Sequence, residues 1–386
     1  MLHTLAIENY RSRRRLVLPL GALTLVTGAN GSGKSNLYRA LRLLAETAQG
    51  GVVAALASEG GLPSALWAGP EQVGRRMRSG EMPIEGVRRD GPVALRLGFA
   101  GEDFGYAIDL GYPKPSASAF ALDAEIKREC FFGGPFLRPA NLMVDRRGAM
   151  LRAREGREWR VLEQHLDPYR SVFVQVADPE RAPEVLSLRE MLRGWRFYDH
   201  FRTDTDAPAR HARLGTRTPV MSADGYDLAA AWQTIREIGD SEALDAALWD
   251  AFPGGRVEID VADGRFSLRF GQEGLLRPMG AAELSDGTLR YLLWIAALHA
   301  PRPPPLMVLN EPETSLHPDL LPALARLIAQ ASRRTQVWVV SHAPRLIAAL
   351  EQERDCHPLA LERDLGGTVL RGQKALDEPP WHWPER

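Results

Sequence analysis

Apolar residues near the N-terminus follow the two periodicities that are typical of an α/β protein. Short apolar runs indicate strands, and a glycine-rich loop follows the third run. After that loop, leucines and alanines at positions 37, 40, 41 and 44 recur at helical spacing. The pattern predicts strands over residues 2–7, 16–20 and 23–26 and an amphipathic helix over residues 34–48.

A second α/β stretch lies in the C-terminal third of the chain. Alternating residues on both sides of Ala262-Asp263-Gly264 indicate a β-hairpin. Alternating helix and strand patterns then follow. The predicted elements are the hairpin over residues 257–261 and 266–270, helices over 289–299 and 320–331, and strands over 306–309 and 337–340.

The middle of the chain has a weaker pattern. Residues 50–69 are rich in Gly, Ala and Ser and predict a loop, whereas residues 106–110 predict a strand. Three segments with helical spacing lead us to expect that residues 112–255 form a mostly helical inserted lobe. Frequent Pro and Gly residues exclude a long coiled coil in this region. The three segments cover residues 184–197, 227–238 and 242–251.

Residues 28–35, Gly-Ala-Asn-Gly-Ser-Gly-Lys-Ser, match a phosphate-binding loop between a strand and a helix. Triphosphate oxygens need several backbone N–H donors in a small volume, and glycines leave room for them. Lys34 can reach the β- and γ-phosphates, and the Ser35 hydroxyl can ligate Mg²⁺. We therefore expect ATP to bind here with Mg²⁺. The expected ATP-binding residues are Gly28, Asn30, Gly31, Ser32, Gly33, Lys34 and Ser35.

A second motif, Glu-Leu-Ser-Asp-Gly-Thr at residues 283–288, directly precedes an apolar helix. Ser285 and Gly287 would offer an anion a hydroxyl, backbone N–H groups and the helix dipole. A plain helix N-cap explains the same residues, and the motif taken alone favours that interpretation.

Two apolar strands end in residues that are able to do chemistry. Residues 306–313 reach Asn310 and Glu311, and residues 337–342 reach His342. The carboxyl ends of parallel strands form the edge where α/β proteins bind ligands. Glu311 is suited to polarise an attacking water, and His342 to contact a γ-phosphate. A surface turn and a structural histidine are the plainer interpretations.

These four motifs, in this order, resemble the ABC-type ATPase heads of the RecF, SMC and OLD group. Residues 7–12, Ile-Glu-Asn-Tyr-Arg-Ser, are similar to the opening strand of that group, which adds Arg11 to the nucleotide-binding residues. The resemblance implies an α/β P-loop NTPase fold with an antiparallel β portion. Residues 1–111 and 256–386 would form the two halves of the head, and residues 112–255 the insert.

The resemblance also implies an ATP-dependent homodimer, because two heads of this group enclose two ATP molecules. Lys34 and Ser35 of one subunit would hold nucleotide and Mg²⁺. Ser285 and Gly287 of a second copy would contact the γ-phosphate. ATP binding would then join two subunits, and hydrolysis would release them.

Catalysis is assigned by the same resemblance to Glu311, His342 and Lys34. The group usually has Asp where this chain has Asn310, the other expected metal ligand. An amide keeps an acceptor oxygen but loses the charge attraction to the metal. We therefore expect a slow Mg²⁺-dependent ATPase. An ATP-gated dimerisation switch that does not hydrolyse ATP is the alternative.

Composition limits the partners of the protein. Its 48 basic and 49 acidic residues give a formal net charge of −1 and hence no global basic field. Cys130 and Cys356 are too few for a disulfide framework, and no apolar run is long enough to cross a bilayer. We expect a cytoplasmic protein without a membrane partner. Arginines at positions 11, 13, 14 and 15, and at 75, 76, 78, 88 and 89, allow DNA binding, although a solvated surface is the plainer interpretation.

The resemblance leaves the biological role open between DNA repair or recombination and phage defence. A transporter ATPase subunit is a further alternative, but the long separation of Lys34 from Ser285 favours the RecF-like group. The segment after His342 is too short for a nuclease domain. Nuclease or toxin activity is therefore expected from a partner protein. The tryptophans at residues 381 and 383 are expected to pack as part of the C-terminal segment.

Overall fold

The computed structural model describes residues 1–69, 94–364, 367–374 and 377–386, which form two compact units. The first unit comprises Met1–Gly21, Gly28–Gly194 and Leu359–Arg386. The second comprises Ala22–Thr27 and Trp195–Pro358. The chain therefore passes between the units more than once, and β3 (Leu23–Gly28) ends where the phosphate loop begins.

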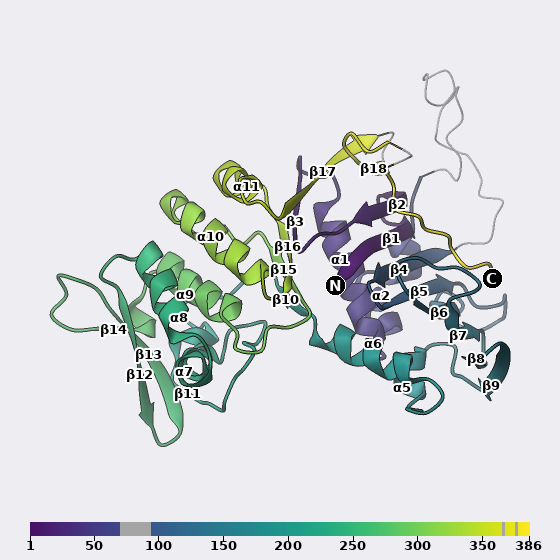
Figure 1. Ribbon diagram of the computed structural model, residues 1–386, viewed down its shortest axis with the longest axis horizontal. Coiled ribbons are helices and arrows are strands. Elements are labelled where there is room, and N and C mark those ends of the chain that lie inside the picture. The colour runs from purple at the N-terminus through teal and green to yellow at the C-terminus, as the bar shows by residue number, and fades with distance from the viewer. Residues whose placement is uncertain (70–93, 365–366, 375–376) are drawn as a thin grey trace. The chain divides into compact units, whose positions relative to one another are not determined.

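The first unit is built on an eight-stranded antiparallel sheet in the order β2-β1-β4-β5-β6-β7-β8-β9 (Figure 1). Helix α1 contacts β1, β4 and α6. The strands are β1 (Leu2–Tyr10), β2 (Arg13–Pro19), β4 (Leu95–Gly101), β5 (Phe104–Gly111), β6 (Glu125–Gly133), β7 (Leu142–Arg147), β8 (Met150–Glu155) and β9 (Glu158–Glu163). The other elements are α1 (Lys34–Thr47), α2 (Val52–Ser58), α3 (Gly61–Ala65), α5 (Val172–Gln175), α6 (Pro183–Gly194) and the hairpin of β17 (Cys356–Asp364) with β18 (Gly367–Leu370).

Charged side chains are buried on the central strands of this sheet. The Glu129 carboxylate on β6 and the Arg146 guanidinium on β7 are both fully buried and lie 2.8 Å apart. The same carboxylate accepts hydrogen bonds from the hydroxyls of Tyr106 at 2.7 Å and Ser171 at 2.5 Å. Buried charges need such partners, because an unpaired ion loses its hydration without compensation.

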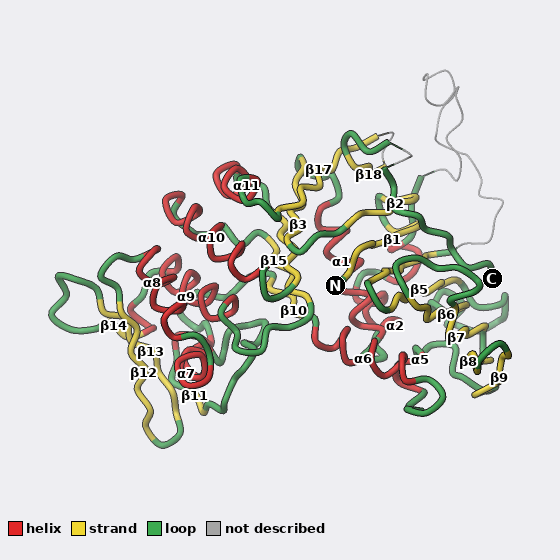
Figure 2. The backbone as a smooth tube through the Cα atoms, in the orientation of Figure 1, coloured by secondary structure: helices red, strands yellow, loops and turns green. Residues whose placement is uncertain are grey.

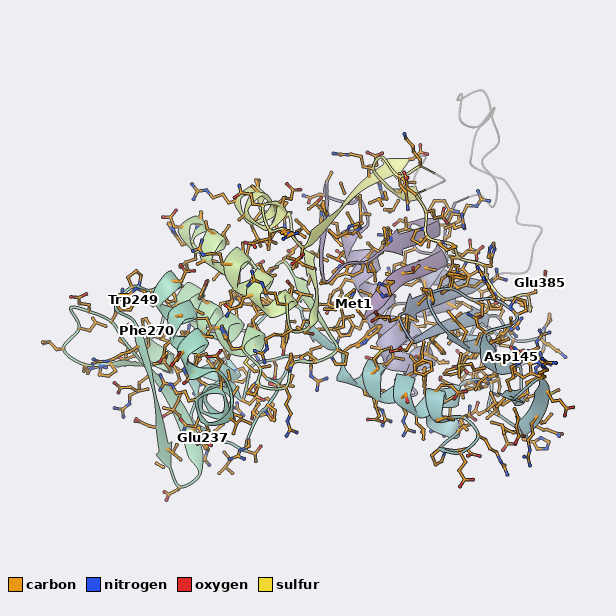
Figure 3. The ribbon with its side chains drawn as sticks, viewed as in Figure 1. Met1, Asp145, Glu237, Trp249, Phe270 and Glu385 are labelled. Carbon is orange, nitrogen blue, oxygen red and sulfur yellow. The ribbon has the colours of Figure 1, made fainter. Side chains whose placement is uncertain are left out.

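The C-terminal segment packs on the same sheet, as the sequence predicted. Trp381 is 4% exposed and lies beside Gly98, where a Cβ would collide with the indole ring. Arg128 donates to the Asp145 carboxylate at 2.8 Å and to the backbone carbonyl of Glu385. Asp145 and Glu385 are both labelled in Figure 3.

The second unit contains parallel strands in the order β10-β15-β16-β3. A small antiparallel sheet of β11 to β14 and the helices α7 to α11 complete the unit (Figure 2). One large apolar cluster joins these helices to the strands. The strands are β10 (Arg196–Tyr198), β11 (Arg213–Leu214), β12 (Arg256–Ala262), β13 (Arg265–Gly271), β14 (Met279–Gly280), β15 (Leu306–Asn310) and β16 (Gln336–Val340). The helices are α7 (Leu228–Ile238), α8 (Ser241–Ala251), α9 (Asp286–Leu298), α10 (Leu321–Ser332) and α11 (Pro344–Glu351), with 3₁₀ turns η1 (Pro208–Arg210), η2 (Ala281–Glu283) and η3 (Pro318–Leu320).

The predicted mixed α/β fold with an antiparallel part is confirmed, but the middle of the chain differs from expectation. Residues 112–255 are not mostly helical throughout, because β6 to β9 occupy residues 125–163 and belong to the eight-stranded sheet, and the helices follow from α5 onward. On β6 and β7, buried charges hide the alternation of apolar and polar residues. The boundary between the units falls after Gly194, inside the expected lobe. The predicted helix over 184–197 also ends at Gly194, before β10.

The predicted loop over residues 50–69 is wrong, because α2 and α3 lie within it. These helices are short, with seven and five residues, and they follow Gly51 and Gly60. Val52 and Leu56 of α2 are buried at the i, i+4 spacing of one helix face, which was the available signal. No helix within the described ranges is long and apolar enough to cross a membrane.

Candidate nucleotide site

The phosphate loop lies between the end of β3 and α1, as predicted. Its three glycines adopt positive φ angles of 147° at Gly28, 76° at Gly31 and 98° at Gly33. Gly33 is the N-cap of α1. Residues other than glycine are strained in such conformations, so the glycines allow the turn that places the loop at the helix N-terminus.

Two of these glycines also face neighbours that exclude a side chain. A Cβ on Gly33 would collide with the Thr368 hydroxyl, and one on Gly28 would lie 2.5 Å from both Ser32 Oγ and the Leu361 carbonyl. At Gly31 a Cβ would meet no described atom within 4 Å. Gly31 and Asn30 are both exposed. The loop is thus tightly held at its ends and open at its middle, as a phosphate-binding backbone requires.

Lys34 and Ser35 are the first residues of α1. The Lys34 ammonium is buried and donates hydrogen bonds to the carbonyls of Gly28 at 2.6 Å and Ala29 at 3.3 Å. Its charge is therefore held directly at the loop. Ser35 is exposed in the first turn of the helix. An exposed hydroxyl at this position fits the role of a Mg²⁺ ligand.

Four neighbours of the loop were not predicted from the sequence. The Thr368 hydroxyl donates to the Ser32 carbonyl at 2.8 Å and lies 2.9 Å from Ser12 Oγ. The Asn36 amide donates to the same Ser12 oxygen at 2.9 Å. These contacts join the turn between β1 and β2, the β17–β18 hairpin and α1. Residues so distant in sequence give no local signal of their meeting.

Arg13 is the fourth neighbour, whereas the sequence predicts Arg11 at the nucleotide. Nη2 of Arg13 donates to the Gly33 carbonyl at 2.5 Å, and the side chain is fully buried. Its Nε and Nη1 atoms have no hydrogen-bond partner among the described residues, and burial lowers the pKa of its guanidinium to about 9. Arg11 instead pairs with Glu59 at 2.7 Å. The structure thus brings Arg13, and not Arg11, into contact with the loop.

The first arginine run does not form a continuous basic surface. Arg11 pairs with Glu59, Arg13 is buried, and Arg15 pairs with Glu378. The second run, at positions 75, 76, 78, 88 and 89, lies outside the described residues.

In the second unit, β15 and β16 bring Asn310, Glu311 and His342 together. The Glu311 amide donates to the Val340 carbonyl at 2.8 Å, and its carboxylate lies 3.4 Å from His342 Nδ1. Glu311 has a φ of 50°, which is uncommon for a residue other than glycine. Its side chain is 43% exposed and that of His342 is 53% exposed. Both can therefore meet a ligand at this sheet edge.

Glu313 is a further residue at this edge, and sequence reasoning gave it no definite role. Its Oε1 atom accepts from the Ser341 hydroxyl at 2.7 Å and from the amides of His342 at 3.0 Å and Ala343 at 3.1 Å. The carboxylate is buried, and its Oε2 atom has no hydrogen-bond partner within the described part of the chain. Glu313 thus fixes the turn that presents His342.

The signature motif, residues 283–288, caps α9. Ser285 is the N-cap, its hydroxyl accepts from the Thr288 amide at 3.2 Å, and it is exposed. Gly287 lies in the first turn, where a Cβ would be 3.0 Å from the Ser315 carbonyl. The N-cap interpretation is therefore correct, and the serine still faces outward rather than into the core.

Arg210 holds the segment before this helix, and the sequence gave no indication of it. Its Nη1 atom donates to the carbonyls of Ala281, Ala282 and Leu284, and its Nη2 atom to the Asp286 carboxylate at 2.8 Å. The Arg210 side chain is 7% exposed. A planar guanidinium can satisfy several acceptors at once, and it thereby holds the backbone before Ser285 and the side chain of Asp286 after it.

The donor chemistry fits Mg²⁺ and a triphosphate. The Ser35 hydroxyl and the Asn310 amide oxygen are hard oxygen donors, which Mg²⁺ prefers. No group of three or more His, Cys, Asp and Glu side chains in the described ranges could hold a metal. Mg²⁺ commonly takes only one or two protein ligands, with phosphate and water oxygens completing its shell.

Comparison with known proteins identifies the family. A family model described as "AAA domain, putative AbiEii toxin, Type IV TA system" matches residues 23–132 and 146–348. This match includes the phosphate loop, the signature motif, Glu311 and His342, and it confirms the predicted ATPase head. None of the curated proteins compared matches the chain.

Several solved structures of SMC heads are similar over nearly the whole chain. The SMC head domain from Thermotoga maritima is 13% identical, with a TM-score of 0.47 over 97% of this chain and 99% of that one. An SMC head bound to the C-terminal winged-helix domain of ScpA is 12% identical, with a TM-score of 0.49 over 96% and 97%. An SMC head with an extended coiled coil, bound to the C-terminal domain of ScpA derived from Pyrococcus furiosus, is 12% identical, with a TM-score of 0.48 over 96% and 95%. The family match covers most of the sequence, and the chain therefore belongs to this family of AAA domains.

Proposed function

We propose that the protein is a slow, Mg²⁺-dependent ATPase that dimerises around ATP. The observation that carries the proposal is that the chain has both a glycine-cradled loop beside Lys34 and an exposed Ser285 at the N-terminus of α9. The loop is suited to hold the phosphates of one nucleotide. The outward-facing helix N-terminus is suited to contact an anion supplied by a second copy.

The roles of the other residues follow from their chemistry. Ser35 and Asn310 would ligate Mg²⁺, and Lys34 would neutralise the phosphates. Glu311 would orient the attacking water, and His342, held 3.4 Å from it, would contact the terminal phosphate. Asn310 lacks the charge of an aspartate, which supports slow hydrolysis and keeps the non-hydrolysing switch as a second candidate.

Two substitutions test the dimer. Light scattering coupled to size-exclusion chromatography would report the ATP-dependent dimer, and equilibrium dialysis would report ATP binding. Ser285→Arg is expected to abolish the dimer while leaving ATP binding intact. Ser187→Arg, at another exposed serine, is the matched control. A Ser285→Arg protein that still dimerises with ATP would disprove the proposed role of the signature motif.

A phosphate-release assay separates the enzyme from the switch. Wild type should release phosphate slowly, and Glu311→Gln should stop release while ATP-dependent dimers accumulate. If wild type forms dimers but releases no phosphate above the Glu311→Gln background, the switch is correct.

We also propose that the ATPase serves a defence system with a partner effector. The family description, "putative AbiEii toxin, Type IV TA system", supports a role in a toxin–antitoxin defence system. Growth inhibition on expression with the product of a neighbouring gene, but not alone, is expected, and Lys34→Ala should remove it. Growth that is unaffected by any combination would contradict the defence role.

A further inference from the structure

Helix α9 lies with one face against the loop of residues 311–315, which carries Glu311. Gly287, Arg290 and Trp294 are spaced i, i+3 and i+7 on α9 and therefore share a face of the helix. Each meets a different backbone carbonyl of the loop. A Cβ on Gly287 would be 3.0 Å from the Ser315 carbonyl, so the two backbones lie unusually close there.

The other two contacts are hydrogen bonds from buried side chains. Arg290 Nη1 donates to the Thr314 carbonyl at 2.7 Å. Trp294 Nε1 donates to the Pro312 carbonyl at 3.0 Å. Arg290 is 3% exposed and Trp294 is 1% exposed, so water competes little for either bond.

Both donors are themselves held in place. The Trp294 ring lies edge-on to Phe201, with ring centroids 4.8 Å apart. Nη2 of Arg290 donates to the Phe201 carbonyl at 2.9 Å and to the Thr203 hydroxyl at 3.1 Å. The N–H groups that face the loop are therefore fixed in direction.

The loop needs outside support because its backbone is strained. Glu311 has a φ of 50° and Ser315 a φ of 61°, both in the left-handed region. Such conformations cost about 1–3 kcal/mol each and persist only where the surroundings enforce them. Two internal hydrogen bonds, from the Thr314 amide to the Glu311 carbonyl and from the Leu316 amide to the Glu313 carbonyl, do not reach the rest of the unit. Outside the loop, the Glu311 amide and the Glu313 carboxylate bond to residues 340–343, and the contacts to α9 add a second support.

We propose that Arg290 and Trp294 are positioning residues that couple the signature end of α9 to Glu311. Ser285 lies at the N-terminus of the helix whose side holds the Glu311 loop. Contact of Ser285 with a nucleotide on a second copy would shift the position of α9. The helix would pass this shift to the Glu311 loop through the three contacts. The coupling rests on the proposed dimer, whereas the support of the loop by α9 does not.

The first experiment measures the support and needs no ATP. Hydrogen exchange detected by mass spectrometry is followed at the amides of Thr314 and Leu316 in Trp294→Phe, which keeps an aromatic ring but loses the donor. Exchange at these amides is expected to become about five- to tenfold faster, which corresponds to one lost hydrogen bond. Trp232→Phe is the matched control, since Trp232 is also fully buried in this unit and its Nε1 has no partner among the described residues. Unchanged exchange in Trp294→Phe would overturn the proposal.

The second experiment measures the coupling. Trp294→Phe and Arg290→Lys are expected to lower kcat for ATP about five- to tenfold, with ATP affinity and ATP-dependent dimerisation unchanged. ATP should slow exchange in the 311–315 loop of wild type and much less in the variants. Equal loss of kcat and dimerisation would indicate mere destabilisation and overturn the coupling. A wild type that neither dimerises nor hydrolyses ATP would refute the proposed function. The first experiment would still test whether α9 supports the Glu311 loop.

Discussion

The Ser341 hydroxyl donates a hydrogen bond of 2.7 Å to Oε1 of Glu313, a buried carboxylate on the neighbouring strand connection. The same oxygen accepts from the backbone amides of His342 and Ala343. One side chain therefore holds the whole turn that follows β16. The position of His342 depends on Glu313 as much as on its own strand.

Glu313→Ala is expected to release this turn, because three donors lose their acceptor and one of them, the Ser341 hydroxyl, is buried. A buried donor that is left unsatisfied costs about 1–3 kcal/mol. Hydrogen exchange should become faster at the amides of His342 and Ala343. Glu311→Ala is the control, since both amides donate to Glu313 instead. Wild-type exchange in Glu313→Ala would show that the turn is held by other contacts.

Substitution of the loop glycines should have graded effects. Gly33→Ala forces a Cβ onto the Thr368 hydroxyl at a φ of 98°, so we expect nucleotide binding to weaken at least tenfold. Gly31→Ala meets no described atom within 4 Å and carries only the conformational cost of about 1–2 kcal/mol at a φ of 76°. Isothermal titration with an ATP analogue measures both. A larger loss in Gly31→Ala than in Gly33→Ala would contradict this geometry.

Asn310→Asp should strengthen metal binding. An added carboxylate about 4 Å from a unit charge contributes up to about 4 kcal/mol at an effective dielectric of about 20. The Mg²⁺ concentration for half-maximal phosphate release should fall, and the maximal rate should rise. No change in either quantity would remove Asn310 from the metal site.

Arg210→Lys should loosen the backbone around Ser285. A lysine cannot reach the carbonyls of Ala281 and Leu284 and the Asp286 carboxylate together. ATP-dependent dimerisation, measured by sedimentation, is expected to weaken about tenfold, while ATP binding by the single subunit is retained. Arg202→Lys is the control, because exposed Arg202 pairs with Asp204 in the same segment. Comparable dimerisation in both variants would rule out this role.

Stability below neutral pH should depend on His299. This residue is 4% exposed, its Nδ1 lies 3.0 Å from the Ile295 carbonyl, and burial lowers its pKa below 6.5. At a pH between the folded and the unfolded pKa of His299, the imidazole binds a proton only in the unfolded chain. The free energy of unfolding therefore falls as the pH drops below about 6.5.

The measurement is urea denaturation at pH 7 and pH 5. We expect the wild type to lose more stability than His299→Asn, which cannot titrate in this range. Equal losses in the two proteins would mean that His299 is protonated as easily when folded as when unfolded.

The local elements could be read from the sequence. The predicted helix at residues 34–48 is α1, and the hairpin and the strands that end near Asn310 and Val340 are present. Periodicity and glycine placement are patterns over a few residues, so they can be recognised without knowledge of the fold. The phosphate loop is of this kind, because its chemistry lies in eight consecutive residues.

Contacts between distant segments were set by the tertiary structure alone. Thr368 and Arg13 reach the phosphate loop from other strands, Glu313 holds the His342 turn, and α9 supports the Glu311 loop. The charged strands β6 and β7 likewise hid their alternation, since Glu129 and Arg146 are buried as a pair. A single sequence records which side chains are present, whereas the partner that makes a buried charge or a strained backbone tolerable is chosen only when the chain folds.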